Sequence, residues 1–256
     1  MIHKNKTAIV TGSSLGIGKA VAYELGTQGA ALGICARNSE QLEKTARWLG
    51  AAGIEILASP CDVSNPEQVN QFVAEVESRF GAVDILVNNA GVGGPNPMLD
   101  DSHAAWRRIM SVNLDGTYYF CKRVLQKMPD AGRIVNLSSV LGKFGVPGYT
   151  AYCSAKHGVI GFTRALSLEV AARKITVNAI CPGWVETQMA EQGMRAGAHA
   201  TGTSYDEFRG SALAAVPLGE ILDPSEIAQL ISFLASDPAR NITGQAYNIC
   251  GGQVMH

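Results

Sequence analysis

Short apolar runs alternate along this chain with longer amphipathic segments, and this alternation constrains the fold more than any other feature of the sequence. Runs that are apolar on both alternate faces are typical of strands in a parallel sheet that helices cover on both sides. The expected strands are Thr7–Thr11, Ala31–Ala36, Ile54–Ala58, Asp84–Asn88, Arg133–Ser138, Ile175–Ile180 and Gln245–Ile249. The expected helices are Gly18–Gln28, Ser39–Leu49, Asn65–Phe80, Ser102–Met128, Tyr152–Ala172 and Pro224–Ser236. Strict alternation predicts right-handed βαβ units and therefore an α/β fold, a doubly wound seven-stranded parallel sheet with helices on both faces.

Composition limits the class of protein. The 256 residues are 46% hydrophobic and 17% charged, which is enough apolar surface for a large core, so we expect a single domain over residues 1–256. Lys and Arg number 21 against 22 Asp and Glu, without the basic excess of a nucleic-acid binder or a polybasic membrane anchor. There is no signal region and no apolar stretch of transmembrane length. The six cysteines are scattered without metal-ligand spacing. We therefore expect a cytoplasmic protein with no metal, nucleic-acid or membrane partner.

One long segment shows no clear periodicity. Ala190–Val216 is rich in Gly, Ala and Thr. A stretch of this length without helix or strand signals in a compact domain usually serves as a lid or a binding loop. We predict a substrate lid around residues 188–216.

A glycine-rich turn, Thr11-Gly12-Ser13-Ser14-Leu15-Gly16-Ile17-Gly18, lies between the first expected strand and the first expected helix. Glycines allow a tight turn and let the backbone approach a pyrophosphate, while the helix N-terminus offers free N–H donors and a favourable dipole. Glycines also join strands to helices for structural reasons alone. The position of this turn, directly after the first strand, favours a dinucleotide site.

The end of the second strand should meet the adenosine ribose of such a dinucleotide. There the sequence reads Ala36-Arg37-Asn38, with no carboxylate to accept bonds from the ribose hydroxyls and to repel a 2′-phosphate. Because an arginine binds phosphate through charge-assisted, bidentate bonds, Arg37 favours NADP(H) over NAD(H). The alternative is that Arg37 is a solvated surface residue and that NAD(H) is used.

Tyr152 and Lys156 are four residues apart at the start of an expected helix, so they share one face, one turn from each other. Ser139 directly follows the fifth expected strand, and ligands of open parallel sheets bind outside the carboxyl ends of the strands. A free tyrosine titrates near pH ~10, and a nearby ammonium should bring the pKa of Tyr152 toward neutral pH. Ser139 can hydrogen-bond the carbonyl oxygen of a substrate. Tyr149 is rejected as the acid because Cys153, not a lysine, follows it four residues later.

With these motifs in this order, the chain resembles the short-chain dehydrogenase/reductase family, whose members have a single-domain Rossmann fold. The resemblance runs from the first strand to Cys250-Gly251-Gly252 and departs from the family pattern at no catalytic position. The chain looks most like 3-oxoacyl-carrier-protein reductases and the ketoreductases of aromatic polyketide synthesis. The motifs that carry the resemblance are Thr11-Gly12-(x)3-Gly16-Ile17-Gly18, Asp62-Val63, Asn88-Asn89-Ala90-Gly91, Asn113, Ser139, Tyr152-(x)3-Lys156 and Pro182-Gly183.

The resemblance implies a role for each site residue. Tyr152 would be the general acid in ketone reduction, or the base in the reverse direction. Lys156 would lower its pKa and hold the nicotinamide ribose, and Ser139 would orient the substrate oxygen. Asn113 would fix a water that relays protons to Lys156. The implied cofactor-binding residues are Gly12, Ser14, Leu15, Gly16, Ile17, Gly18, Arg37, Asp62, Val63, Asn89, Ala90, Gly91, Tyr152, Lys156, Pro182, Gly183, Val185 and Thr187.

Two further expectations come from the family. Some NADPH-dependent members carry a basic residue just before the second glycine of the turn, where this chain has Leu15, so Arg37 would have to bind the 2′-phosphate alone. Family members are usually homotetramers built through their long helices and the C-terminal segment, so we expect a homotetramer here.

The substrate side of the site is expected to be apolar and aromatic, which favours a ketone of moderate hydrophobicity. The expected pocket residues are Gly94, Phe144, Tyr149, Trp184 and Met189. Together these features predict an oxidoreductase that transfers a hydride between a nicotinamide cofactor, NADPH favoured, and a ketone or secondary alcohol. The expected substrate is a small-molecule or carrier-bound ketone, either a 3-oxoacyl thioester or a hydrophobic cyclic or aryl ketone.

Two alternatives stay open. The first is an NAD-dependent secondary alcohol dehydrogenase acting on an aryl or alicyclic alcohol. The second is a non-catalytic dinucleotide-binding sensor or scaffold, which would have no need of Ser139, Tyr152 and Lys156.

Overall fold

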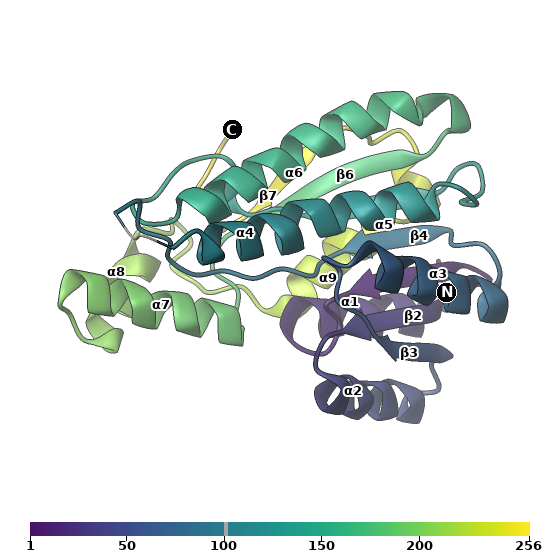
Figure 1. Cartoon of the computed structure of the whole chain (residues 1–256), viewed down its shortest axis with the longest axis horizontal. Coiled ribbons are helices and arrows are strands. Elements are labelled where there is room, and N and C mark those ends of the chain that lie inside the picture. The colour runs from purple at the N-terminus through teal and green to yellow at the C-terminus, as the bar shows by residue number, and fades with distance from the viewer. Residues whose placement is uncertain (100–101) are drawn as a thin grey trace.

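A computed structural model describes residues 1–99 and 102–256 of the chain. One sheet of seven strands runs through these residues in the order β3-β2-β1-β4-β5-β6-β7 (Figure 1). All neighbouring strands are parallel, which confirms the predicted doubly wound α/β fold. The strands are β1 (Thr7–Thr11), β2 (Ala31–Ala36), β3 (Ile56–Pro60), β4 (Ile85–Asn88), β5 (Arg133–Leu137), β6 (Thr176–Pro182) and β7 (Ala246–Ile249).

Helices cover both faces of the sheet. Apolar residues of α1, α2 and α9 pack on one face, and those of α3, α4, α5 and α6 pack on the other (Figure 1). The α-helices of the described residues are α1 (Gly16–Thr27), α2 (Ser39–Ala51), α3 (Pro66–Phe80), α4 (Ala104–Met110), α5 (Gly116–Val124), α6 (Thr150–Glu169), α7 (Gln188–Thr201), α8 (Tyr205–Ala214) and α9 (Pro224–Leu234). In the described part of the chain, no helix is both long and apolar enough to cross a bilayer.

The strand order reverses between β1 and β4, and this reversal positions the site. The carboxyl ends of β1, β4, β5 and β6 meet at one edge of the sheet, as the pairing of Val10 with Val87 and of Leu137 with Ile180 shows. Ligands of doubly wound sheets bind outside the carboxyl ends at such a switch point. The glycine turn after β1 and Ser139 after β5 are therefore brought to the same edge.

Two expected elements differ in the structure. The helix predicted over Ser102–Met128 is interrupted, because α4 and α5 are separated by a π-helical segment, Ser111–Asp115. A π-helical turn inserts one extra residue, which the hydrophobic spacing does not reveal. The strand predicted at Ile54–Ala58 lies two residues later. Ile54 belongs to the turn after α2, where its N–H donates to the carbonyl of Leu49 (3.3 Å).

The segment expected to be a loop is helical instead. α7 and α8 cover most of residues 188–214 and form a helical hairpin that extends from the sheet (Figure 1). Two glycines of α7 let aromatic side chains pack closely against it. A Cβ atom at Gly193 would lie 3.6 Å from the Trp184 ring, and one at Gly197 would lie 2.2 Å from the Phe208 ring. Local caps also start both helices: the Thr187 side chain caps α7, and Ser204 and Glu207 form a capping box at the start of α8.

Candidate active site

The turn between β1 and α1 has the shape that a phosphate group requires. Gly12 and Gly16 have φ angles of 65° and 52°, which favour glycine. A Cβ atom at Gly18 would lie 2.3 Å from the carbonyl oxygen of Gly12, so a side chain there would displace the turn. The first turn of α1 has no side-chain cap and no acidic residue. Its N–H groups can therefore bind an anion, which fits the pyrophosphate of a dinucleotide.

The Asn89 side chain supports this turn. Its Nδ2 donates to the carbonyl oxygens of Thr11 (2.9 Å) and Gly12 (3.1 Å). The Thr11 hydroxyl in turn accepts hydrogen bonds from the N–H groups of Asn89 (3.0 Å) and Ala90 (2.9 Å). The end of β4, the predicted Asn-Asn-Ala-Gly motif, is thus bound to the glycine turn and fixes its shape.

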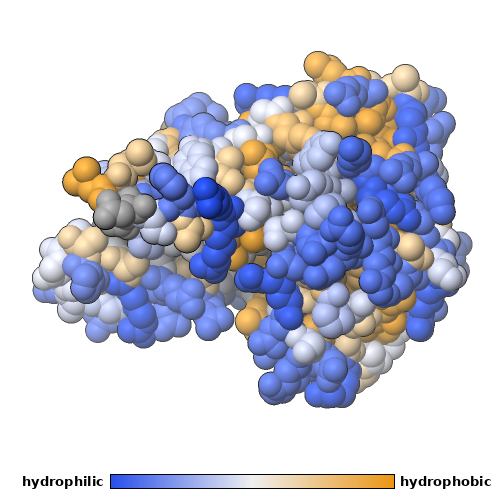
Figure 2. Space-filling model, viewed as in Figure 1, coloured by the Kyte–Doolittle hydropathy of each residue, from blue (hydrophilic) through white to orange (hydrophobic). Residues whose placement is uncertain are grey.

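The adenosine side of the cleft is an open hollow of about 460 Å³. Ser14, Ala36, Arg37 and Asn38 line it, and the Arg37 side chain is exposed. Figure 2 shows a notch between the α7–α8 hairpin and the part of the molecule that carries α2. Position and charge of Arg37 therefore fit the 2′-phosphate of NADP(H), and Ser14 and Asn38 add polar groups beside it.

The next loop contributes Asp62 and Val63. Burial raises the pKa of the Asp62 carboxyl, but hydrogen bonds from Ser64 and the nearby Arg37 guanidinium outweigh burial and hold that pKa below its usual value. The Val63 side chain is buried against Gly116 of α5, where an added Cβ atom would lie 2.8 Å away. Val63 could therefore contact an adenine only through its backbone. Asp62 could offer an ionised carboxylate to the adenine.

Tyr152 and Ser139 are brought together as the sequence predicts. Tyr152 is the third residue of α6, and Ser139 follows the end of β5. Burial raises the pKa of Tyr152 to about 12, although a hydrogen bond with Ser139 lowers it. The expectation that the pKa of this phenol is shifted toward neutral pH is therefore wrong for this structure, because desolvation outweighs the hydrogen bond with Ser139. The phenol stays protonated at neutral pH, as a general acid must.

Lys156 lies one turn further along α6 and is 4% exposed. Its Nζ atom is 5.6 Å from the centre of the Tyr152 ring and donates a 2.7 Å hydrogen bond to the carbonyl oxygen of Leu137. Burial lowers the pKa of Lys156 to about 8. The ammonium is thus close enough to stabilise a phenolate that forms when Tyr152 gives up its proton.

Close packing holds the catalytic helix to the end of β5. The Ser138 hydroxyl donates to the carbonyl oxygen of Lys156 (2.9 Å). A Cβ atom at Gly142 would lie 2.4 Å from Ser138 Oγ and 2.8 Å from that same carbonyl oxygen. Sequence reasoning did not identify Ser138 and Gly142, because their role depends on the approach of α6 and not on a local motif.

Asn113 lies in the π-helical segment, as a buried residue 1% exposed. Its side chain binds the backbone of Val92 at both ends, accepting from the N–H (2.9 Å) and donating to the carbonyl oxygen (2.8 Å). Both ends of the side chain thus help to fix the segment after β4. A Cβ atom at Gly91 would lie 2.9 Å from Asn113 Oδ1 and 3.7 Å from Lys156 Nζ, so Gly91 leaves room between the two residues. The predicted water relay stays a prediction.

The stretch after β6 closes the other side of the cleft. Gly183 packs tightly on Cys250, where a Cβ atom would lie 2.9 Å from the Cys250 Cβ. The Thr187 hydroxyl donates to the carbonyl oxygen of Val185 (3.2 Å) and accepts from the N–H of Ala190 (3.2 Å), so it caps α7. The Thr187 methyl group lies over the glycine turn, 3.0 Å from a Cβ atom at Gly16. Pro182–Thr187 thus lies opposite the phosphate turn, as expected for the residues around a nicotinamide.

The predicted substrate residues lie on several elements around Tyr152. A Cβ atom at Gly93 would lie 3.8 Å from Met189 and 3.9 Å from the Tyr152 ring, so Met189 and the segment after β4 flank the phenol. Gly94 has a φ of 135° and nothing within 4 Å of an added Cβ. Trp184 packs on α7 at Gly193. Tyr149 is partly buried, which raises the pKa of its phenol. Phe144 instead packs in a small apolar cluster with Val140, Cys250 and Val254.

A phosphate-binding turn and a tyrosine–lysine pair at one edge of a doubly wound sheet define a dinucleotide-dependent oxidoreductase. A family model described as enoyl-(acyl carrier protein) reductase matches residues 12–253. The 3-oxoacyl-(acyl-carrier-protein) reductase FabG of Haemophilus influenzae is 38% identical over 251 residues, covering 97% of this chain and 98% of that protein.

Two solved structures are similar over their whole length. A variant of actinorhodin polyketide ketoreductase, crystallised with NADPH, is 40% identical with a TM-score of 0.93, over 97% of each chain. A blue fluorescent protein from a metagenomic library, in complex with NADPH, is 30% identical with a TM-score of 0.90, over 100% of each chain. The chain belongs to the short-chain dehydrogenase/reductase family, and it is an NAD(P)-dependent oxidoreductase acting on CH–OH or ketone groups.

Proposed function

We propose that this enzyme reduces ketones with NADPH, and that its substrate is a 3-oxoacyl thioester or a hydrophobic cyclic or aryl ketone. The single observation that carries the proposal is the arrangement of Tyr152, with the Ser139 hydroxyl beside its phenol and the Lys156 ammonium 5.6 Å from its ring. Bound NADPH would supply the hydride. The relatives named above support the substrate class, since one is a 3-oxoacyl reductase and another a polyketide ketoreductase.

The protein's own residues then have separate tasks. Ser139 holds the carbonyl oxygen of the substrate beside the phenol of Tyr152. Tyr152, which is protonated at neutral pH, gives its proton to that oxygen as negative charge develops on it. Lys156 stabilises the phenolate that is left. A protonated phenol and a buried cation suit reduction, which fits the proposed direction.

The preference for NADP(H) rests on Arg37. Its guanidinium lies at the hollow after β2, where the sequence has no acidic residue before Asn38 and where Ser14 and Asn38 supply further polar groups. NADPH in two of the similar structures supports the same preference.

We propose that the α7–α8 hairpin is the lid of the substrate pocket. Met189 in the first turn of α7 is 43% exposed and lies beside Gly93 and the Tyr152 ring. Met98 and Leu99 after β4 are also exposed, at 76% and 97%. Figure 2 shows hydrophobic surface at the left of the molecule, above the place where Figure 1 draws this hairpin. An apolar mouth of this kind favours a hydrophobic acyl chain or ring over a charged substrate.

The test is a screen of two cofactors against three classes of ketone. NADPH and NADH are each combined with acyl thioesters, aryl ketones and alicyclic ketones, and the initial rate of cofactor oxidation is measured. We expect turnover with NADPH and with at least one of these classes. Turnover with NADH but not with NADPH would favour the NAD-dependent alcohol dehydrogenase, and no turnover with either cofactor would favour the non-catalytic binding protein.

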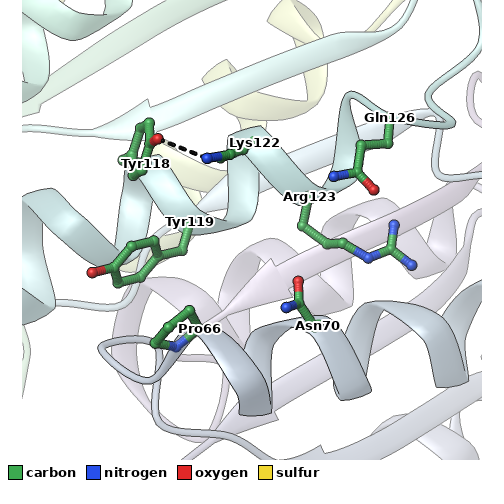
Figure 3. Close-up of a pocket in the computed structure, with 7 residues that line it drawn as sticks. All are labelled: Pro66, Asn70, Tyr118, Tyr119, Lys122, Arg123 and Gln126. Atoms are coloured by element: carbon green, nitrogen blue, oxygen red, sulfur yellow. Dashed lines mark hydrogen bonds between the residues drawn. The ribbon is translucent and has the colours of Figure 1, made fainter.

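We also propose a homotetramer in the cytoplasm. The outer face of α4, α5 and α6 exposes large apolar and aromatic residues: Trp106, Tyr118 and Leu168 are exposed by 42%, 42% and 79%. Figure 2 shows hydrophobic surface where Figure 1 places the end of α6, and such patches are typical of subunit interfaces. Residues of α3 and α5 also line a surface hollow of about 230 Å³ (Figure 3). The six cysteines are free thiols, as in a reducing compartment. Light scattering on the purified protein tests the tetramer.

A further inference from the structure

The catalytic helix α6 begins without a cap of its own. Tyr149 occupies the capping position and makes no capping bond with its side chain. The first N–H groups of a helix have no partner within the helix and must be satisfied from outside. Tyr152 is the third residue of this uncapped turn, so the position of its phenol depends on whatever binds the turn.

Asn96 binds it, from a different part of the chain. Its Oδ1 accepts a hydrogen bond from the N–H of Ala151 (2.9 Å), and its Nδ2 donates to the Thr150 hydroxyl (2.9 Å). Its backbone N–H donates to the carbonyl oxygen of Gly148 (2.7 Å). Asn96 is only 9% exposed. One buried side chain thus replaces the missing cap and holds the two residues that directly precede Tyr152.

The segment that carries Asn96 is held at its other end by Asn113, through the two bonds to Val92. Between these two anchors lie Gly93, Gly94 and Pro95, and Gly93 faces both Tyr152 and Met189. The same segment therefore forms a wall of the substrate pocket and caps the helix that carries the acid. Through Asn96, the wall and the phenol are kept in a fixed relationship.

We propose that Asn96 is a positioning residue for the reaction: it caps α6 from the pocket wall and so sets the place of the Tyr152 phenol relative to Ser139 and Lys156. The inference rests on the proposed function, because it gives Tyr152 the role of acid. Asn96 itself does not contact the reacting atoms. Its effect is expected on the rate of the chemical step and not on the binding of NADPH.

The test compares three variants with the wild-type enzyme. Asn96→Ala removes both side-chain bonds. Asn96→Asp keeps an acceptor for the N–H of Ala151, and the Thr150 hydroxyl can donate to the carboxylate in place of accepting. Asn178→Ala is the matched control, because Asn178 is a buried asparagine whose side chain also bonds at both ends. It donates to the carbonyl oxygen of Ile242 (2.7 Å) and accepts from the N–H of Gln245 (3.1 Å), but it lies within β6.

For each variant we would measure kcat, the dissociation constant of NADPH, the melting temperature and hydrogen exchange in the first turn of α6. We expect kcat to fall roughly ten- to hundredfold in Asn96→Ala, as small displacements of a reacting group do. NADPH affinity should stay within about threefold of wild type, because the phosphate turn is untouched. Exchange at the start of α6 should become faster, and Asn96→Asp should restore most of kcat.

A purely structural role gives a different pattern. If Asn96→Ala and Asn178→Ala lower the melting temperature and kcat alike, or if Asn96→Ala keeps full kcat, the inference is wrong. Failure of a folded Asn96→Asp to recover kcat would also overturn it. Absence of ketone reduction by the wild-type enzyme would instead refute the proposed function, and the exchange measurement would still show whether Asn96 caps α6.

Discussion

The Nζ atom of Lys156 donates a 2.7 Å hydrogen bond to the carbonyl oxygen of Leu137, the last residue of β5. This bond draws a buried amine to the strand end next to Ser139. It satisfies one of the three donors of the ammonium and offsets only part of the cost of desolvation. Burial therefore lowers the pKa of Lys156 to about 8, well below its ordinary value of 10.5.

The first prediction concerns the pH dependence of ketone reduction. Lys156 is charged below its pKa of about 8 and loses its proton as the pH rises through that value, whereas Tyr152, with a pKa of about 12, stays protonated. Once the charge is lost, the phenolate that proton donation leaves no longer has a cation beside it to stabilise it. We expect kcat for reduction to be level near pH 7 and to fall above about pH 8. A rate that stays level to pH 10 would contradict this assignment of the charge.

The same buried charge predicts an effect on stability. The pKa of Lys156 is lower in the folded protein than in the unfolded chain, so protonating Lys156 destabilises the folded state. This loss of stability is complete below about pH 8 and disappears above pH 10.5. Lys156→Met should therefore raise the free energy of unfolding of the cofactor-free protein at pH 7, by at most about 3 kcal/mol. Urea denaturation at pH 7 and pH 10 measures this gain, which should shrink at the higher pH. A variant less stable than wild type at pH 7 would show that the bond to Leu137 outweighs desolvation.

Removing the phenolic hydroxyl tests the acid directly. Tyr152→Phe should lower kcat for reduction by about 10²- to 10⁴-fold, the usual contribution of a positioned acid. NADPH binding should persist, because the phosphate turn and Arg37 are unchanged. Tyr149→Phe, three residues earlier, should cost much less. Steady-state rates and a fluorescence titration with NADPH separate the two effects, and the reverse order of losses would make Tyr149 the acid.

Much of the fold follows from alternation of short apolar runs and amphipathic segments, since strands buried on both faces carry a strong local signal. The signal weakens where burial is partial. β3 is an edge strand whose residues are mostly half-buried or exposed, and its predicted position was two residues too early. The prediction of a loop over α7 and α8 was wrong because it relied on the Gly, Ala and Thr content of this segment. The capping residues Thr187, Ser204 and Glu207 are local signals that could have indicated both helices.

In the site too, features that local spacing fixes could be predicted, and features that depend on tertiary contacts could not. The spacing of Tyr152 and Lys156 predicts their adjacency, because one helical turn fixes it. The direction of the pKa shift of Tyr152 could not be predicted, since burial depends on every segment packed around the phenol. The cap supplied by Asn96 was also out of reach: 54 residues separate it from its partner Thr150, and only the tertiary fold brings them together.

The proposed preference for NADP(H) rests on the exposed guanidinium of Arg37. Arg37→Asp removes a partner of the 2′-phosphate and adds a charge that repels it, so kcat/KM with NADPH should fall by roughly a hundredfold, while use of NADH should improve. Arg47→Asp makes the same change on the exposed face of α2 and should leave the preference unchanged. The ratio of kcat/KM for the two cofactors is the measurement. A wild-type enzyme that uses NADH as well as NADPH would refute the role of Arg37.

Substrate size should be set at Gly93. A Cβ atom there would make ordinary contacts, 3.8 Å to Met189 and 3.9 Å to the Tyr152 ring, so Gly93→Ala should fold and keep activity on small ketones. The larger branched side chain of Gly93→Val would extend into the space between Met189 and the phenol. We expect it to raise KM for bulky cyclic or aryl ketones by about tenfold or more, a loss equivalent to about 1.4 kcal/mol of binding, with little effect on short linear ones.

The comparison needs a control for the glycine substitution itself. Gly50→Val is suitable, because nothing lies within 4 Å of an added Cβ atom at this position in α2, far along the sequence from the pocket. It should leave the ratio of kcat/KM for bulky and small ketones as in wild type. If Gly93→Val accepts both sizes as the wild-type enzyme does, substrates do not pass between Met189 and Tyr152. The pocket must then open on another side of the phenol, toward Tyr149 and Trp184.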